Sequence, residues 1–174
     1  MIVAITPRLE LRRFSLDDVE GFYNLNEDSE VIRYTGDRPF KDRQEVETFI
    51  LAYDHYEKHG IGRWSVYLRE TGNYIGFSGL KFDPAKNQLD IGFRFYREHW
   101  SKGYATESAI AALRIGFDEF GADVIVGRAM QDNAASHSVL KKLAMRPDFV
   151  FEESGKPWLQ YQLTATRFHQ HFDQ

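Results

Sequence analysis

Residues 89–108 read LDIGFRFYREHWSKGYATES, an apolar-rich strand followed by a turn of small residues and the start of an amphipathic helix. Gly103 and Ala105 let the backbone approach a ligand closely. The first N–H groups of the following helix have no partner within the helix, and the positive end of its dipole favours a bound anion. The junction therefore predicts a phosphate-binding turn. Its neighbours in the sequence must specify which phosphorylated ligand it holds.

The composition excludes several kinds of function. The 174 residues carry 22 basic and 26 acidic side chains in mixed order, so no basic stripe predicts a nucleic-acid partner. The absence of cysteine excludes disulfides and acyl transfer through a cysteine thioester. We expect one domain over residues 1–174, a cytoplasmic location and no membrane partner, because neither a signal peptide nor a long apolar run is present.

Hydrophobic periodicity divides the chain into strands and helices. Before the junction it predicts a strand over 8–14, a helix capped by Ser15, a second helix over 43–58, and strands over 63–69, 74–82 and 88–95. After the junction it predicts a helix over 104–120, a strand beginning at 124, a helix from the cap Asn133 to Leu143, and strands near 149–153 and 158–164. The short turns between the three central strands predict antiparallel pairing, and the crossover helix predicts one parallel neighbour.

Five short motifs occur in an order that is typical of one family. They are Leu89-Asp90-Ile91-Gly92-Phe93, residues 100–107, Asn133-Ala134-Ala135-Ser136, residues 8–12 and residues 71–76. Together they resemble the GNAT superfamily of acetyl-CoA-dependent N-acetyltransferases, and most closely its RimJ/RimL-like branch, over about residues 6–163. The resemblance implies an α/β (α+β) fold with a mixed, mostly antiparallel sheet. That sheet would have about six to seven strands, splayed at the acetyl-CoA site and flanked by about four helices.

The resemblance also implies which residues hold acetyl-CoA. Main-chain groups of the bulged and splayed strand would meet the pantetheine amides, and N–H groups of the turn would bind the pyrophosphate. The implied cofactor-binding residues are Phe93, Arg94, Phe95, Ser101, Lys102, Gly103, Tyr104, Ala105, Thr106, Asn133 and Ser136. Trp100 stands where the family usually has glutamine or arginine, and Ser101 stands where it often has glycine. Lys141 or Lys142 is a candidate for the outer phosphate of CoA.

The catalytic residues that the resemblance implies are Ser136 and Asp90. The family commonly protonates the leaving thiolate with a tyrosine seven residues after the equivalent of Asn133, but Leu140 occupies that position. Ser136 is the natural substitute, as an acid or as a hydrogen-bond donor to the sulfur. Asp90 lies where the family often has glutamate, and it is either a general base acting through water or a salt partner on the exposed face. The oxyanion would be stabilised by a backbone N–H of residue 93 or 94.

The amine acceptor stays open at this point. A protein N-terminal α-amino group is favoured because its pKa of about 8 leaves roughly a tenth of it neutral at pH 7, far more than a lysine amine. A small-molecule amine is one alternative, and a non-catalytic acyl-CoA-binding or sensing domain is another. The acceptor side is expected to include Tyr34, the loop 33–40, Trp64 and Trp158. Both a monomer and a homodimer are compatible with the sequence.

No metal site is expected. His169 and His171 have a spacing that suits a metal, but they lie on a tail that we expect to fray, without further ligands.

Overall fold

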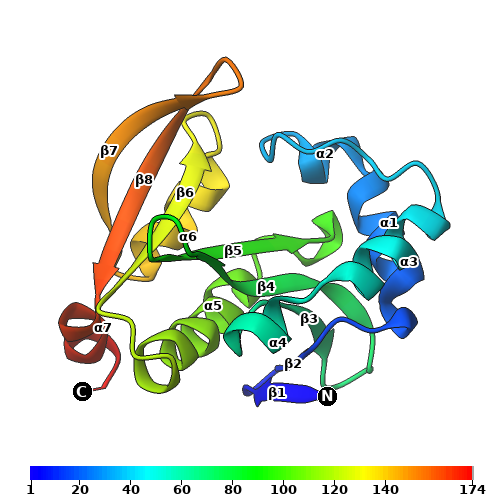
Figure 1. Ribbon diagram of the computed structural model, residues 1–174, viewed down its shortest axis with the longest axis horizontal. Helices are drawn as coiled ribbons and strands as arrows, with labels where there is room; N and C mark the ends of the chain where they lie inside the picture. The colour runs from blue at the N-terminus through cyan, green and yellow to red at the C-terminus, as the bar shows by residue number, and fades with distance from the viewer. Residues whose placement is uncertain (174) are drawn as a thin grey trace.

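The computed structural model describes residues 1–173, which form an eight-stranded sheet with helices on both faces (Figure 1). The strands are β1 (Ile2–Ile5), β2 (Leu9–Arg12), β3 (Arg63–Leu68), β4 (Tyr74–Asp83), β5 (Gln88–Phe95), β6 (Val124–Met130), β7 (Arg146–Glu153) and β8 (Lys156–Thr164). Their order in the sheet is β1-β2-β3-β4-β5-β6-β8-β7. Neighbours are antiparallel except β5 and β6, which are parallel. The expected mixed, mostly antiparallel sheet is confirmed, with slightly more strands than the resemblance implied.

The helices form two groups on opposite faces of the sheet. They are α1 (Val19–Glu27), α2 (Ser29–Ile32), α3 (Arg43–Ala52), α4 (His55–His59), α5 (Tyr104–Arg114), α6 (Ala134–Lys142) and α7 (Ala165–Phe172). On one face, Phe22 of α1 stacks on Phe77 of β4 with ring centroids 5.7 Å apart. On the other face, the π-helical turn Ile115–Glu119 that continues α5 packs on the sheet through Gly116, close to Leu80 and Ile125.

The sheet opens between β5 and β6. Only residues 89–91 of β5 pair with residues 125–127 of β6, although the two strands continue to Phe95 and Met130. Figure 1 shows β6, β8 and β7 rising away from the line of β5. The splayed sheet that the resemblance implied is therefore present. The implied bulge is not, because β5 pairs with β4 in unbroken register from Gln88 to Phe95, and the gap comes from the divergence of β6.

The helix expected over 43–58 is two helices. α3 ends at Ala52 and α4 begins at His55, with Tyr53 in an extended conformation between them. The break turns two tyrosines toward the start of β3. The Tyr53 hydroxyl accepts the N–H of Arg63 at 2.8 Å, and the Tyr56 hydroxyl donates to the carbonyl of Arg63. These contacts with the start of β3, seven and ten residues further along the chain, outweigh the continuous helical periodicity of the sequence.

Both ends of the chain are more ordered than the sequence suggests. β1 was not expected, yet it pairs with β2 along the edge of the sheet. The tail expected to fray forms α7, whose Phe168 is fully buried against the rest of the core. A salt bridge of 2.9 Å between Arg114 and Asp173 holds the end of this helix.

Candidate functional site

The gap between β5 and β6 opens into a cleft of about 540 Å³. Its walls come from the end of β5, the turn before α5, the first turns of α6, and the segment around α2. The lining residues are Glu30, Val31, Tyr34, Thr35, Phe93, Arg94, Phe95, His99, Trp100, Ser101, Gly103, Tyr104, Ala105, Thr106, Asp132, Asn133, Ala134, Ala135, Ser136, Ser138, Val139 and Lys142. Every cofactor-binding residue predicted from the sequence lines this cleft, except Lys102. The carbonyl of Lys102 instead accepts a hydrogen bond from Arg8.

The main chain at the end of β5 faces the cleft on alternate residues. The N–H of Tyr96 donates to the carbonyl of Ile75 on β4 at 3.1 Å, so the groups of residue 94 also point toward β4. The groups of Phe93 and Phe95 consequently point toward the gap, where β6 has left the sheet. Of the two oxyanion candidates, the Phe93 N–H faces the cleft and the Arg94 N–H does not.

Trp100 and Ser101, the two departures from the family pattern, have structural explanations. The indole N–H of Trp100 donates to the carbonyl of Phe95 at 2.8 Å and so ties the turn to β5. Ser101 has a φ of 60°, in the left-handed region that residues other than glycine rarely adopt. Gly103, at φ 83°, then leads directly into α5. The positive φ angles at residues 101 and 103 explain why glycine is favoured at both of these positions.

A salt bridge from the other end of the sheet fixes the same turn. The Nε of Arg8 lies 2.6 Å from a carboxylate oxygen of Glu107 in α5, and its guanidinium lies 4.4 Å from the centre of the Tyr104 ring. Thr6 and the Arg8 N–H also donate to Glu107. Partial burial raises the pKa of Glu107, but these hydrogen bonds outweigh it and hold the pKa below its usual value. Sequence reasoning did not foresee this clamp, although residue 8 opens one of the five motifs.

Asn133 and Ser136 form a small hydrogen-bonded unit at the start of α6. The Oδ1 of Asn133 accepts the N–H of Ser136 at 3.2 Å and caps the helix as predicted. The Nδ2 of Asn133 donates to the Ser136 hydroxyl oxygen at 2.9 Å. Because that oxygen already accepts, the hydroxyl hydrogen is free to donate into the cleft. Leu140, at the position of the family's tyrosine, is buried against Gly127 and contributes to the core.

His99 also lines the cleft. Its Nδ1 is buried and has no hydrogen-bond partner among residues 1–173. Burial is the largest influence on this imidazole and lowers its pKa, which favours the neutral form.

Asp90 lies outside the cleft, on the opposite face of β5 from Phe93. Its Oδ2 is 3.5 Å from a guanidinium nitrogen of Arg63, and its side chain is 23% exposed. Burial raises the pKa of Asp90, while the positive charges of Arg63, Arg128 and Lys81 act in the opposite direction. Asp90 is thus a partly buried partner of an arginine at the point where the strands part.

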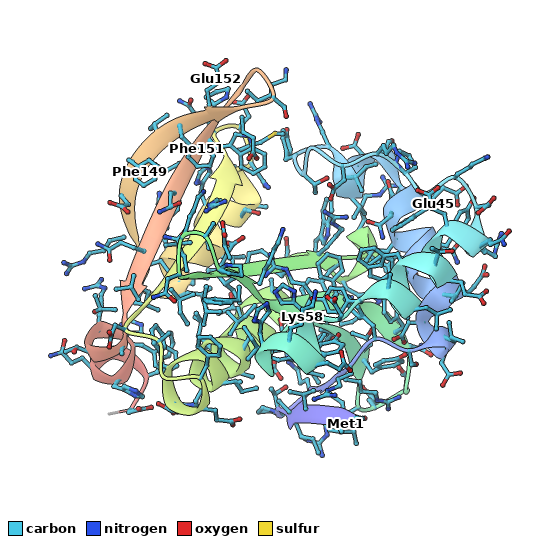
Figure 2. The ribbon with its side chains drawn as sticks, in the orientation of Figure 1. Met1, Glu45, Lys58, Phe149, Phe151 and Glu152 are labelled. Atoms are coloured by element: carbon cyan, nitrogen blue, oxygen red, sulfur yellow. The ribbon has the colours of Figure 1, made fainter. Side chains whose placement is uncertain are left out.

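The residues expected on the acceptor side lie in different places. Tyr34 lines the cleft, and the Trp158 ring approaches to 4.0 Å from where a Cβ on Gly36 would lie. Trp158 also stacks on Phe151 of β7, which Figure 2 places on the far side of the molecule from Met1. Trp64 does not belong to this wall, because it is 2% exposed in the main core.

The residues in the cleft fit a long ligand with a phosphate at one end and amides in its arm. The helix N-terminus with its left-handed turn suits the phosphates, and Lys142, but not Lys141, lines the same cleft. The outward main chain of β5 suits the amides. Within residues 1–173, no helix is long and apolar enough to cross a membrane.

Comparison with known proteins gives a consistent family. The family model described as "Acetyltransferase (GNAT) domain" matches residues 8–146. The chain is 30% identical over 162 residues to the "Uncharacterized N-acetyltransferase YoaA" of Bacillus subtilis, and the match covers 88% of this chain and 90% of that protein.

Two solved structures share the fold and differ in the substrate that their titles give. The ribosomal-protein-S5-alanine acetyltransferase from Vibrio fischeri superposes with a TM-score of 0.81 at 12% identity, over 97% of this chain and 98% of that one. The spermidine N-acetyltransferase from Vibrio cholerae, in complex with CoA and spermine, superposes with a TM-score of 0.78 at 18% identity, over 92% and 97%.

Proposed function

The chain belongs to the GNAT acetyltransferase family and uses acetyl-CoA as co-substrate, and from this premise we propose that its acceptor is a protein N-terminal α-amino group. The observation that carries the proposal is the meeting of three groups in one cleft. These are the outward main chain of Phe93 and Phe95, the free helix N-terminus after Gly103, and the Asn133–Ser136 pair. Each supplies a different part of an acyl-transfer site.

The co-substrate would be held along the unpaired edge of β5. The main-chain groups of Phe93 and the N–H of Phe95 are available to its amides, whereas the Phe95 carbonyl already accepts from Trp100. N–H groups of the turn before α5 are available to its pyrophosphate. His99 adds a buried nitrogen without a partner to the same wall. When bound, acetyl-CoA supplies an activated acetyl thioester that a neutral amine attacks directly.

Three groups of this chain would assist that attack. The Phe93 N–H faces the cleft and would donate to the oxygen that becomes negative in the tetrahedral intermediate. Ser136, whose oxygen already accepts from Asn133, would donate a hydrogen bond from its hydroxyl to the sulfur and so stabilise the departing CoA thiolate, keeping its own hydrogen. Asp90 would take the amine proton through water from the opposite face of β5. The N–C bond forms, the C–S bond breaks, and the proton passes to solvent.

The small number of acid and base groups in the cleft supports an N-terminal acceptor. An α-amino group with a pKa of about 8 is partly neutral at pH 7 and needs little assistance, whereas a lysine amine needs far more. The ribosomal-protein acetyltransferase among the structural neighbours supports a RimJ/RimL-like assignment. A small-molecule amine is the second candidate, supported by the likeness to the spermidine N-acetyltransferase.

The test supplies acetyl-CoA with a panel of acceptors and follows release of the free thiol. The panel holds peptides with different N-terminal residues, the same peptides with blocked N-termini, and small amines that include spermidine. We expect turnover on free peptide N-termini and none on the blocked controls. Turnover on small amines alone would replace the proposed acceptor. Binding of acetyl-CoA without turnover on any acceptor would indicate a binding or sensing domain.

A further inference from the structure

We propose that Arg63 is a positioning residue for acetyl transfer, seated by a pair of glycines so that its guanidinium holds the Asp90 carboxylate in place as the proton acceptor. The inference rests on the proposed function, in which Asp90 takes the amine proton. It adds a residue from β3 that neither the sequence motifs nor the cleft contains.

Two glycines that face each other make the seat for Arg63. Gly79 of β4 and Gly92 of β5 are direct partners in the sheet. A Cβ on Gly92 would lie 2.5 Å from the Nη2 of Arg63 and 2.6 Å from its Cζ. A Cβ on Gly79 would lie 2.3 Å from the carbonyl oxygen of Gly62. The glycine in β5 therefore makes room for the guanidinium, and the glycine in β4 makes room for the main chain beside it.

Neutral groups orient the guanidinium. Its Nη1 donates to the carbonyl of Gly79 at 2.8 Å and to the carbonyl of Asp90 at 2.6 Å. The main chain of Arg63 is itself fixed by the hydroxyls of Tyr53 and Tyr56. Because carbonyls carry no net charge, the positive charge of Arg63 is left to act on the Asp90 carboxylate, 3.5 Å from Nη2.

The arrangement sits where β5 and β6 part. Asp90 belongs to the last residues of β5 that pair with β6, and Gly92 is the first residue beyond them. Three cations face the Asp90 carboxylate from three strands: Arg63 from β3, Lys81 from β4 and Arg128 from β6. Among residues 1–173, Arg63 alone lies within ion-pair distance of it. Arg128 is bound instead to the side-chain oxygens of Gln88 and Gln160.

The experiment compares pH profiles of kcat/KM for Arg63→Met, Arg63→Lys and Gly92→Ala, using a peptide acceptor. Loss or displacement of the neighbouring cation raises the pKa of Asp90, so the acidic limb of the profile should move to higher pH. At pH values below both pKa values, we expect Arg63→Met to lose about tenfold in kcat/KM for each pH unit of that movement, and to recover at higher pH. Gly92→Ala should move the acidic limb in the same direction as Arg63→Met. Arg63→Lys should lose less kcat/KM than Arg63→Met. The KM for acetyl-CoA should stay within about twofold.

Arg128→Met is the matched control, because it removes a cation on the same face that makes no ion pair with Asp90, and it should move the limb less. If Arg63→Met does not fold, the pH profiles of Arg63→Lys and Gly92→Ala test the same prediction. An equal loss at every pH, with an unmoved limb, would reduce Arg63 to a structural residue and overturn the inference. Full activity of Asp90→Asn would overturn it as well, while the proposed function would stand. Absence of turnover in the wild type would overturn both.

Discussion

Replacement of Arg8 by alanine tests how far the turn before α5 depends on the clamp beneath it. The change removes the 2.6 Å contact with Glu107, the 2.8 Å hydrogen bond to the Lys102 carbonyl and the contact with the Tyr104 ring. A hydrogen bond to a charged group contributes about 1.5–3 kcal/mol, and a cation–π contact at an exposed site about 0.5–1 kcal/mol. The Arg8 side chain is 46% exposed, so solvent weakens both, and we expect a loss of about 1–2 kcal/mol of unfolding free energy.

That loss corresponds to a fall of about 2–6 °C in Tm for a chain of this size, measurable by thermal denaturation. The functional effect should be specific. Without Arg8 the turn is more mobile, and its N–H groups are held less firmly in the orientation that binds the pyrophosphate. The KM for acetyl-CoA should therefore rise about fivefold to tenfold, while kcat changes less than about twofold. Arg43→Ala, which breaks an exposed salt bridge with Glu20, is the control and should leave KM unchanged. A lower Tm for Arg8→Ala with an unchanged KM would refute the reasoning.

Three further changes test other parts of the structure. Ser136→Ala should lower kcat about tenfold or more, with little change in the calorimetric affinity for acetyl-CoA, and an unchanged kcat would remove Ser136 from catalysis. Because the pKa of Glu107 is lowered in the folded chain, its stabilising effect is present above the unfolded pKa of about 4.3 and is lost as pH falls. The stability difference between wild type and Glu107→Gln in urea should therefore shrink below about pH 4, and a constant difference would contradict this. Phe168→Ala should cost about 3–5 kcal/mol in the same assay, and a loss below about 1 kcal/mol would mean that α7 is loosely docked.

Much of the fold was predictable because local patterns and long-range packing agree. The strands β3, β4 and β5 alternate in hydrophobicity and are joined by turn residues, so their antiparallel order follows from short-range signals. The cap at Asn133 and the crossover between β5 and β6 follow in the same way. The periodicity of residues 43–58 predicted one helix, but the chain breaks at residue 53, where tyrosine hydroxyls form hydrogen bonds with the main chain of Arg63. The C-terminal helix was missed because its apolar face consists of three residues, Ala165, Phe168 and Phe172.

The candidate site was predictable where the backbone defines it and unpredictable where distant side chains complete it. Glycine at residue 103 and asparagine at residue 133 are local requirements of a turn and a cap, and sequence exposes them. The clamp between Arg8 and Glu107 joins residues about one hundred positions apart, and no spacing rule predicts such a pair. Trp64 was predicted to line the acceptor side but lies in the core, for a related reason. Its place in the core depends on which face of the sheet α5 covers, because α5 contacts β2 and β4 on either side of β3.

The short pairing between β5 and β6 leaves main-chain groups at the end of β5 without a neighbouring strand. Only residues 89–91 and 125–127 join the β1–β5 part of the sheet to the β6–β8 part. A ligand bound along Phe93 and Phe95 by main-chain hydrogen bonds would act as an additional strand and complete the row of bonds that β6 abandons. On this view the bound co-substrate takes the place of a strand segment between β5 and β6, and its binding should raise the free energy of unfolding.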